Sequence, residues 1–354
     1  MIEVNRNGEV WVFAEQEAGK LSDVPLELLS KGRELAGKLG VPLAAVLVGR
    51  GVAGLAQALI AHGADKVYLV EDDRLDHYQA AGYAKVICDL ITKHKPQVCL
   101  YGATPLGRDL APTVASAMKC GLTADCTDLQ IGDHTDPTTR EEHKNLLLQI
   151  RPAFGGNIIA TIVNPRRWPQ MATVREGVMR LSDSDAKREG KIVREKASLD
   201  GVELPLEFHE VHRRPKKVNL KAARIIVAGG AGMGSKENFR LVWDLANVLG
   251  AAAAGSRAAV DLGFIDHDHQ VGQTGTTVRP ALYIACAISG AVQHRAGMQE
   301  SAKILAINSD RDAPIFGVAH YGIVGDVNEV IPRLIKAIRG GASVTTPAQS
   351  AGKA

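Results

Sequence analysis

Short apolar runs alternate with amphipathic stretches along the first part of the chain. The strand-like runs lie at 10–14, 43–48, 66–70 and 97–102. The stretches with helical spacing of apolar residues lie at 25–40, 54–62 and 78–94. Strands that alternate with helices predict a parallel sheet with helices on both faces. The pattern resembles a nucleotide-binding α/β fold, which by itself says little about function.

The pattern changes after Asp128. Three short β-like runs follow at 146–152, 157–163 and 171–178 with no long helix between them, and we expect them to pair antiparallel. The next segment, 182–214, is rich in charged residues and poor in periodic apolar ones. We therefore predict a domain boundary near residue 215, with a first domain at 1–215.

A second α/β pattern follows. Strand-like runs lie at 224–230, 282–288, 303–308 and 315–318. Helices are predicted at 235–250, with Ser235 as the N-cap and Gly250 as the stop, and at 327–339. These elements predict a doubly wound domain at 216–340. The small and polar tail, 341–354, is expected to be disordered.

The composition is that of a two-domain globular protein, with 354 residues, 45% of them hydrophobic and 23% charged. A net charge of +3 and 4% aromatic residues argue against nucleic acid or an anionic membrane as a partner. No stretch approaches the roughly 18 continuous apolar residues of a membrane-spanning helix, so we expect no membrane insertion.

The cysteines carry no metal-binding pattern. They are Cys88, Cys99, Cys120, Cys126 and Cys286, and none forms a CxxC pair. Iron–sulfur clusters and structural zinc sites need four ligands at tight spacing, so neither is expected. An odd number of cysteines without a signal peptide predicts free thiols in a cytoplasmic protein.

A glycine cluster, Gly229, Gly230, Gly232 and Gly234, lies between a predicted strand and a predicted helix. Small residues at this place let backbone amides reach a phosphate group. The spacing departs from the GxGxxG of a dinucleotide fold because Ser235 stands where a glycine would be expected. A tight turn without a ligand explains the cluster equally well.

A second candidate feature is the segment 255–279. It places the polar residues Ser256, Arg257, Gln273 and Thr274 among many small ones. Loops of this kind bring backbone and short polar groups close to a flat ligand, although two surface loops with glycine turns are the alternative.

The third candidate feature is the segment 282–308. An apolar strand runs into Ser289–Gly290, which opens a helix with Gln293 and His294, and a second strand ends at Asn308. Two neighbouring strands with a small-residue turn at the carboxyl end of the first describe a ligand crevice in a parallel sheet. A lone histidine on a helix face, however, is more often structural than functional.

The order and spacing of these segments resemble the electron-transfer flavoprotein alpha subunit. The motifs are GSR at 255–257, QVGQTG at 270–275, LYIA at 282–285, ISGAVQH at 288–294, AIN at 306–308 and YGIVGD at 321–326. Looser agreement comes from VWVFAEQ at 10–16, GATPLGRDLAP at 102–112 and RPAFGGN at 151–157. The resemblance thus covers nearly all of residues 10–340.

The resemblance implies that the second domain binds one FAD non-covalently and that the first domain packs on a beta subunit. The residues that match the family's FAD contacts are Ser256, Arg257, Val271, Gly272, Gln273, Thr274, Ser289, Gly290, Ala291, Val292, Gln293, His294, Asn308, Asp326 and Val327. No metal ligand and no catalytic acid, base or nucleophile is implied, because the cofactor supplies the chemistry.

Three of these residues, Arg257, Thr274 and His294, would address the isoalloxazine ring. One-electron reduction places negative charge near N1 and the C2 carbonyl of the flavin. A fixed cation or an imidazole donor stabilises that charge, and a guanidinium suits the role because it stays charged and lies flat against a ring. The hydroxyl of Thr274 can bond N5.

The other end of FAD would meet a second group of residues. Ser289, Gly290 and the backbone amides after them would address the pyrophosphate, as a helix N-terminus does. Asn308 and Asp326 would face the adenosine end. Ala231 departs from the family, which often has arginine there, so this chain lacks one charged group that could meet the cofactor.

The leading hypothesis is therefore a redox carrier that moves electrons on FAD. The donor would be NADH or a flavin dehydrogenase such as an acyl-CoA dehydrogenase, and the sequence leaves the acceptor and any electron bifurcation open. An alternative from the enzyme class is a nicotinamide-dependent dehydrogenase that uses the Gly229–Gly234 loop. A third hypothesis is a cofactor-free assembly module in which all these loops are only turns.

Overall fold

The computed structural model describes residues 5–153, 158–211, 218–221 and 223–340. The chain divides into two compact units, unit 1 (Met1–His212) and unit 2 (Arg213–Ala354). The domain boundary expected near residue 215 and the tail 341–354 both lie outside the described residues.

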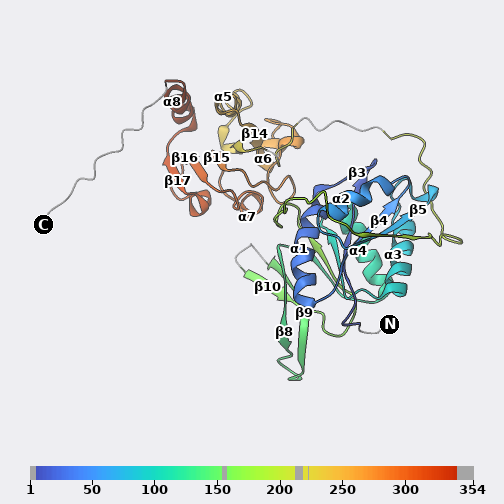
Figure 1. The fold of residues 1–354 in the computed structure, drawn as a ribbon. Coiled ribbons are helices and arrows are strands. Elements are labelled where there is room, and N and C mark those ends of the chain that lie inside the picture. The colour runs from blue at the N-terminus through green and yellow to red at the C-terminus, as the bar shows by residue number, and fades with distance from the viewer. Residues whose placement is uncertain (1–4, 154–157, 212–217, 222, 341–354) are drawn as a thin grey trace. The chain divides into compact units, whose positions relative to one another are not determined.

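Unit 1 is built on a seven-stranded sheet in which every neighbouring pair is parallel. In spatial order the strands are β12 (Lys191–Glu195), β5 (Lys66–Glu71), β4 (Leu43–Gly49), β1 (Val10–Phe13), β6 (Val98–Gly102), β11 (Gln170–Val174) and β7 (Leu122–Cys126). The helices are α1 (Asp23–Leu39), α2 (Ala56–Ala61), α3 (Ala80–His94) and α4 (Pro105–Met118) (Figure 1).

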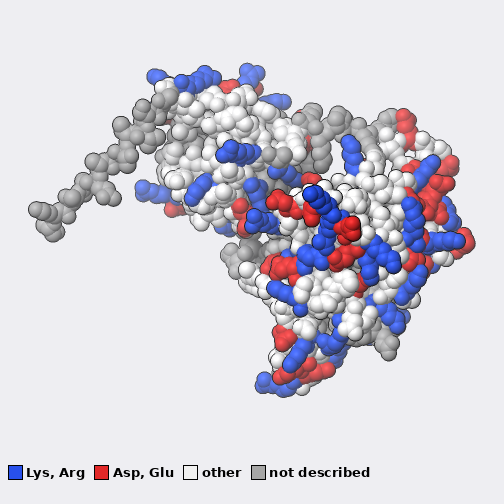
Figure 2. All heavy atoms as spheres, in the orientation of Figure 1, with Lys and Arg blue, Asp and Glu red and all other residues white. Residues whose placement is uncertain are grey.

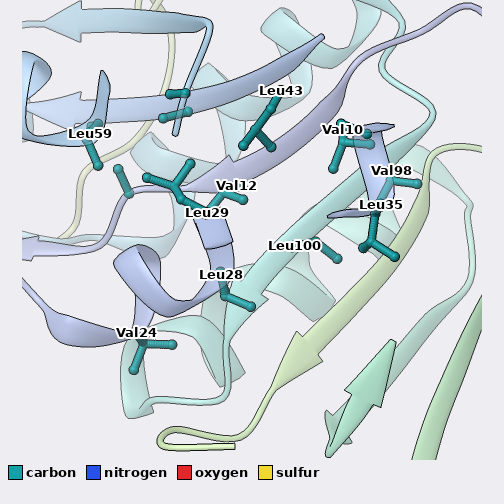
Figure 3. Packing of buried hydrophobic residues seen from close by; sticks show 14 of the residues in the cluster. Val10, Val12, Val24, Leu28, Leu29, Leu35, Leu43, Leu59, Val98 and Leu100 are labelled. Atoms are coloured by element: carbon teal, nitrogen blue, oxygen red, sulfur yellow. The ribbon is translucent and has the colours of Figure 1, made fainter. Parts of the chain in front are cut away.

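The sheet of unit 1 has an apolar core on each face. Along β1, Val10 and Val12 pack with α1 and α2, while Trp11 and Phe13 pack with α3 and α4. The alternation follows from the two-residue period of a strand, and strands buried on both faces read as continuous apolar runs. Figure 3 shows the first of these cores, with Val12 among residues from β4 and α1.

A three-stranded antiparallel sheet of β8 (Asp128–Thr135), β9 (Glu142–Ala153) and β10 (Ile158–Ile162) also belongs to unit 1. The antiparallel pairing expected for the runs at 146–152 and 157–163 is thus confirmed. The same expectation for 171–178 was wrong, because β11 lies parallel between β6 and β7. All five residues of β11 are buried, as a central strand of a parallel sheet requires.

One strand lies in the charge-rich segment 182–214. β12 pairs in parallel with β5 at the edge of the sheet and exposes most of its side chains. An edge strand with charged side chains carries little of the apolar signal that reveals a central strand. Figure 2 shows acidic and basic side chains interspersed around α1 and α3, as the small net charge suggests.

Unit 2 is a doubly wound parallel sheet. In spatial order its strands are β14 (Ala252–Gly255), β13 (Ile225–Gly229), β15 (Leu282–Cys286), β16 (Ile304–Asn308) and β17 (Tyr321–Val324). The helices are α5 (Arg240–Leu249), α6 (Arg257–Asp261), α7 (Val292–Arg295) and α8 (Val327–Arg339). The α/β class predicted for both parts of the chain is confirmed.

Two expectations for unit 2 were wrong in detail. The helix at 235–250 begins only at Arg240, because the N–H groups of Arg240 and Leu241 bond the carbonyls three residues back and so form separate turns. The Ser235 hydroxyl does accept from the Asn238 N–H at 3.2 Å, as expected of an N-cap, but it caps these turns. The run at 315–318 is a 3₁₀ helix that begins at Pro314, where a missing N–H favours a helix start over a strand. The helix stop at Gly250 is confirmed, with φ at 62°.

All five cysteines are free. Within the described residues, no helix is both long and apolar enough to cross a membrane. The same residues contain no group of three or more His, Cys, Asp or Glu side chains placed to hold a metal ion.

Candidate functional site

A cavity of about 590 Å³ lies at the carboxyl ends of the unit 2 strands. Its wall consists of Gly230–Gly232, Ser256–Ala258, Asp261, Gln270–Thr274, Ala287–Ser289, Ala291, Gln293, His294, Asn308–Asp310 and Ala313. The chain leaves β13 toward β14 but leaves β15 toward β16, in the opposite direction. Ligands of doubly wound folds bind at such a switch point, so we call this space the switch-point cavity.

Glycines let the loops after β13 and β15 approach each other at the rim. A Cβ on Gly230 would lie 2.1 Å from the carbonyl oxygen of Ala287, and the Gly230 N–H donates to the Cys286 carbonyl at 2.9 Å. Ala287 itself has φ at 51°, a left-handed conformation that costs energy in a residue with a side chain. The glycine cluster therefore closes one wall of the cavity.

Ser256 and Arg257 enter the cavity at the start of α6. The Ser256 hydroxyl caps this short helix by accepting from the Ala259 N–H at 3.3 Å. The side chain of Arg257 is 70% exposed and lies 3.5 Å from the Asp261 carboxylate. Among the described wall residues Arg257 is the one permanent cation, and Asp261 and Asp310 are the acidic ones.

The loop Val271–Thr274 is held by its backbone. The Val271 N–H donates to the Gly255 carbonyl at 2.9 Å, and the Gln273 N–H donates to the Gln293 carbonyl at 2.8 Å. The Gln270 side-chain amide donates to the Thr274 hydroxyl oxygen at 3.1 Å. Since that oxygen is an acceptor here, the hydroxyl hydrogen of Thr274 stays available for another acceptor.

His294 lies on α7 and is buried, with 6% of its surface exposed. Its Nε2 lies 3.1 Å from the hydroxyl of Tyr283, whereas Nδ1 makes no hydrogen bond of ordinary geometry within the described residues. Burial lowers the pKa of His294 to about 4. The imidazole is therefore neutral at pH 7, and its second nitrogen is without a well-aligned partner.

Asn308 ties the loops after β15 and β16 together. Its amide donates to the Ile288 carbonyl at 3.0 Å, and its side-chain oxygen accepts from the Asp310 N–H at 3.0 Å. The Ser289 carbonyl accepts from the Ile315 N–H at 3.0 Å. Ser289 itself is exposed and lies on the cavity wall.

Four residues expected at the site do not lie on this wall. Gly290 packs against Ile315, Val292 is the first residue of α7, and Val327 is the first residue of α8 and lies buried in the core. Asp326 caps α8 by accepting from the Asn328 N–H at 2.8 Å. Their contribution to FAD binding stays a prediction. The other expected residues all line the cavity, as follows: Ser256, Arg257, Val271, Gly272, Gln273, Thr274, Ser289, Ala291, Gln293, His294 and Asn308.

Sequence reasoning missed several residues at or near the cavity. Gln270 stands inside the QVGQTG motif, and Tyr283 inside LYIA, so the motifs contained both. Asp261 and Asp310 also line the cavity, but in the sequence they lie a few residues after the motifs GSR and AIN. Only the folded arrangement shows that these side chains contact the expected ones.

Comparison with known families decides among the three hypotheses. Residues 10–200 match the model described as electron transfer flavoprotein domain, and residues 219–299 match the electron transfer flavoprotein FAD-binding domain. The chain belongs to the electron transfer flavoprotein alpha-subunit family. The resemblance drawn from the motifs is thereby confirmed.

Individual relatives span nearly the whole chain. An electron transfer flavoprotein subunit alpha of Thermoanaerobacterium thermosaccharolyticum is 50% identical, over 95% of this chain and 99% of that protein. A protein FixB of Clostridium saccharobutylicum is 51% identical, over 92% and 95%. An acryloyl-CoA reductase electron transfer subunit beta of Anaerotignum propionicum is 42% identical, over 96% and 98%.

The cofactor of this alpha subunit is FAD, and its function is electron transfer. The FAD-binding match at 219–299 contains most loops that line the switch-point cavity. The hypotheses of a nicotinamide-dependent dehydrogenase and of a cofactor-free assembly module are therefore set aside.

Proposed function

We propose that FAD binds in the switch-point cavity with its isoalloxazine ring against Arg257, Thr274 and His294. The observation that carries this placement is the convergence of loops from four neighbouring strands on one cavity, on whose wall these three side chains lie together. Two of the three, the Arg257 guanidinium and the Thr274 hydroxyl, have donors that are available to a ligand. A site built for a flavin needs such donors where its ring gains charge.

Arg257 and neutral His294 would tune the flavin in different ways. When FAD accepts an electron, the added negative charge spreads toward N1 and the C2 carbonyl. Arg257 stabilises that charge through space, although its exposure and the nearby Asp261 carboxylate weaken the effect. His294 would meet the ring as a neutral imidazole, because burial lowers its pKa.

The diphosphate would be bound mainly by neutral groups. Ala231 stands on the wall where the family often has arginine, and the wall residues that the structure describes include no lysine. Hydroxyl groups such as that of Ser289, together with backbone N–H groups of the rim, would then hold the phosphates. Asn308 would lie toward the adenosine end.

We further propose that this alpha subunit works with a beta subunit and accepts electrons from a flavin dehydrogenase of the acyl-CoA class. The family supports the first point, because its members are described as subunits. The acryloyl-CoA reductase electron transfer subunit supports the second by its name. Free cysteines favour the cytoplasm as the compartment.

The test is to co-express the chain with its beta subunit and to record the absorption spectrum of the purified complex. We expect flavin bands, and we expect free FAD after denaturation. Addition of an acyl-CoA dehydrogenase and its substrate should bleach the flavin without oxygen, while substrate alone should not. A complex that stays colourless after FAD is added back would contradict the FAD site. A bound flavin that no acyl-CoA dehydrogenase reduces would contradict only the proposed donor.

A further inference from the structure

Gln270 begins the turn that carries Thr274. It is 3% exposed and lines the switch-point cavity. Its backbone bridges Gly255 at the end of β14, and its carbonyl accepts from the Thr276 N–H at 2.8 Å. A Cβ on Gly275 would lie 2.9 Å from Cγ of Gln270, so the absence of a side chain there lets the turn pass close to Gln270. The backbone of Gln270 is thus tied at two points, and its side chain is confined.

The side chain of Gln270 makes a directed contact with Thr274. Its Nε2 donates to the Thr274 hydroxyl oxygen at 3.1 Å. An amide nitrogen has hydrogens to donate and no acceptor, so in this contact the hydroxyl can only accept. Thr274 is exposed on the cavity wall, and its own hydrogen stays available to an acceptor in the cavity. The buried amide therefore leaves the hydroxyl able to donate to a ligand.

The residue type at position 270 decides which role the hydroxyl takes. A carboxylate of the same length, as in Gln270→Glu, would only accept, and a charge-assisted bond would take the single hydrogen of the Thr274 hydroxyl. The cavity would then meet an oxygen lone pair in place of a donor. An apolar side chain of similar length, as in Gln270→Met, would leave the hydroxyl free to rotate. Of these three side chains, only the amide favours a donor toward the ligand.

This difference matters at N5 of a flavin ring. In oxidised FAD this nitrogen has a lone pair and accepts a hydrogen bond, whereas in fully reduced FAD it carries a hydrogen. A donor beside N5 therefore binds the oxidised ring better than an acceptor does. We propose that Gln270 is a positioning residue that holds the Thr274 hydroxyl as a hydrogen-bond donor to N5 of oxidised FAD. The inference rests on the proposed place of the isoalloxazine ring beside Thr274, and Gln270 acts on N5 only through that hydroxyl.

The experiment compares two ligands in equilibrium titrations of the apo-complex of alpha and beta subunits. One is oxidised FAD, and the other is oxidised 5-deaza-FAD, in which a C–H group replaces N5. The two have the same charge and nearly the same shape, so the ratio of their affinities reports the hydrogen bond at N5. In the wild type we expect FAD to bind about ten-fold more tightly than 5-deaza-FAD, as one neutral hydrogen bond allows.

Both substitutions at Gln270 should change this ratio. In Gln270→Met we expect it to fall to about three-fold, and in Gln270→Glu to about one. The charge that Gln270→Glu adds acts on both ligands alike and cancels in the ratio. In a Thr274→Val background, neither substitution should change the ratio further, because the effect passes through the hydroxyl. Binding of 5-deaza-FAD shows for each variant that the cavity is intact.

Two variants outside the described cavity wall serve as controls. Thr276→Val removes a hydroxyl from the same turn, and Gln299→Glu adds a negative charge at an exposed position of unit 2. Both should keep the wild-type ratio.

Two results would overturn the inference. One is a ratio that keeps its wild-type value in Gln270→Glu but falls in Thr274→Val. The place of the flavin ring would then stand, and the hydroxyl would donate without Gln270. The other is a ratio that does not depend on Thr274 either, which would remove the ring from beside Thr274 and so contradict the proposed function as well.

Discussion

The two units of this chain each carry a parallel sheet, yet the polar groups at the carboxyl ends of their strands behave differently. In unit 1 these groups bond to each other. Arg175, just after β11, donates to the Asp125 carboxylate of β7 at 2.7 and 3.2 Å. Thr104, after β6, donates to the Glu15 carboxylate, after β1, at 2.6 Å.

In unit 2 some of the corresponding groups are not fully bonded to one another. The Thr274 hydroxyl accepts from Gln270 and keeps its hydrogen for another acceptor, and Nδ1 of His294 makes no well-aligned hydrogen bond in the described structure. The comparison teaches that a parallel sheet alone predicts no ligand. A binding site arises where the loops at the rim leave polar groups for a cofactor instead of using them on one another.

The largest effect should come from a change that damages the rim of unit 2 alone. A Cβ on Gly290 would lie 2.2 Å from the backbone nitrogen of Ile315, at a φ of 87°. We expect Gly290→Ala to lower the free energy of unfolding of unit 2 by about 3 kcal/mol and to release FAD. Denaturant titration that follows flavin release and far-UV circular dichroism measures both.

Gly263→Ala is the matched control for that variant. Gly263 also has a positive φ, 71°, but no atom lies within 4 Å of the added Cβ. It should cost only about 1 kcal/mol, from backbone strain. Equal losses in the two variants would show that the close approach at Gly290 has no role.

Acid should separate the two units. The pKa of His294 lies near 4 in the folded protein and near 6.5 when unfolded, so the unfolded state binds the proton first. Stability is therefore full above about pH 6.5 and is lost as the pH falls toward 4, by about 3 kcal/mol in unit 2. In unit 1 burial opposes ionisation of Asp125, yet the Arg175 guanidinium holds the pKa of that carboxyl below its ordinary 3.8, and its loss comes at lower pH.

The measurement is the free energy of unfolding of the FAD-free complex between about pH 7.5 and pH 4. This range runs from above the unfolded pKa of His294, 6.5, down to its folded pKa, about 4. His294→Gln should remove the step in unit 2 and leave unit 1 unchanged. A wild-type profile that stays flat over this range would mean that His294 is not the buried neutral group described above.

Adding the missing charge to the rim should strengthen cofactor binding. If the phosphates of FAD lie near Ala231, Ala231→Arg should bind FAD more tightly by about 1 to 2 kcal/mol, or about 5- to 30-fold. Equilibrium titration of the apo-complex with FAD measures the change. Ala231→Gln controls for side-chain length without charge, and equal affinities of the two variants would place the phosphates elsewhere.

The sequence predicted much of this arrangement because local patterns encode it. Apolar runs located the central strands, and the motifs from GSR to AIN located the loops on the cavity wall. β11 was misassigned because a strand's pairing partner depends on distant residues, here Val98–Gly102 of β6. β12 was missed because charged edge strands carry a weak apolar signal.

The hydrogen bonds of the site were beyond the sequence for the same reason. Nothing in the spacing of Tyr283 and His294 shows that β15 and α7 bring a hydroxyl to an imidazole nitrogen. Likewise, the low pKa of His294 comes from burial by residues far apart in the chain. Such properties belong to the folded structure, whereas residue type and order belong to the sequence.

The most direct test of the account is an anaerobic stepwise reduction of the wild-type and Arg257→Ala complexes. A charge about 4 Å from the flavin is worth about 4 kcal/mol at an effective dielectric of 20. That energy corresponds to about 170 mV for one electron, and the 70% exposure of Arg257 makes the expected change smaller. We expect the Arg257→Ala complex to keep FAD but to show a lower first-electron potential. An unchanged potential with FAD bound would contradict the placement of the flavin ring beside Arg257 in the switch-point cavity.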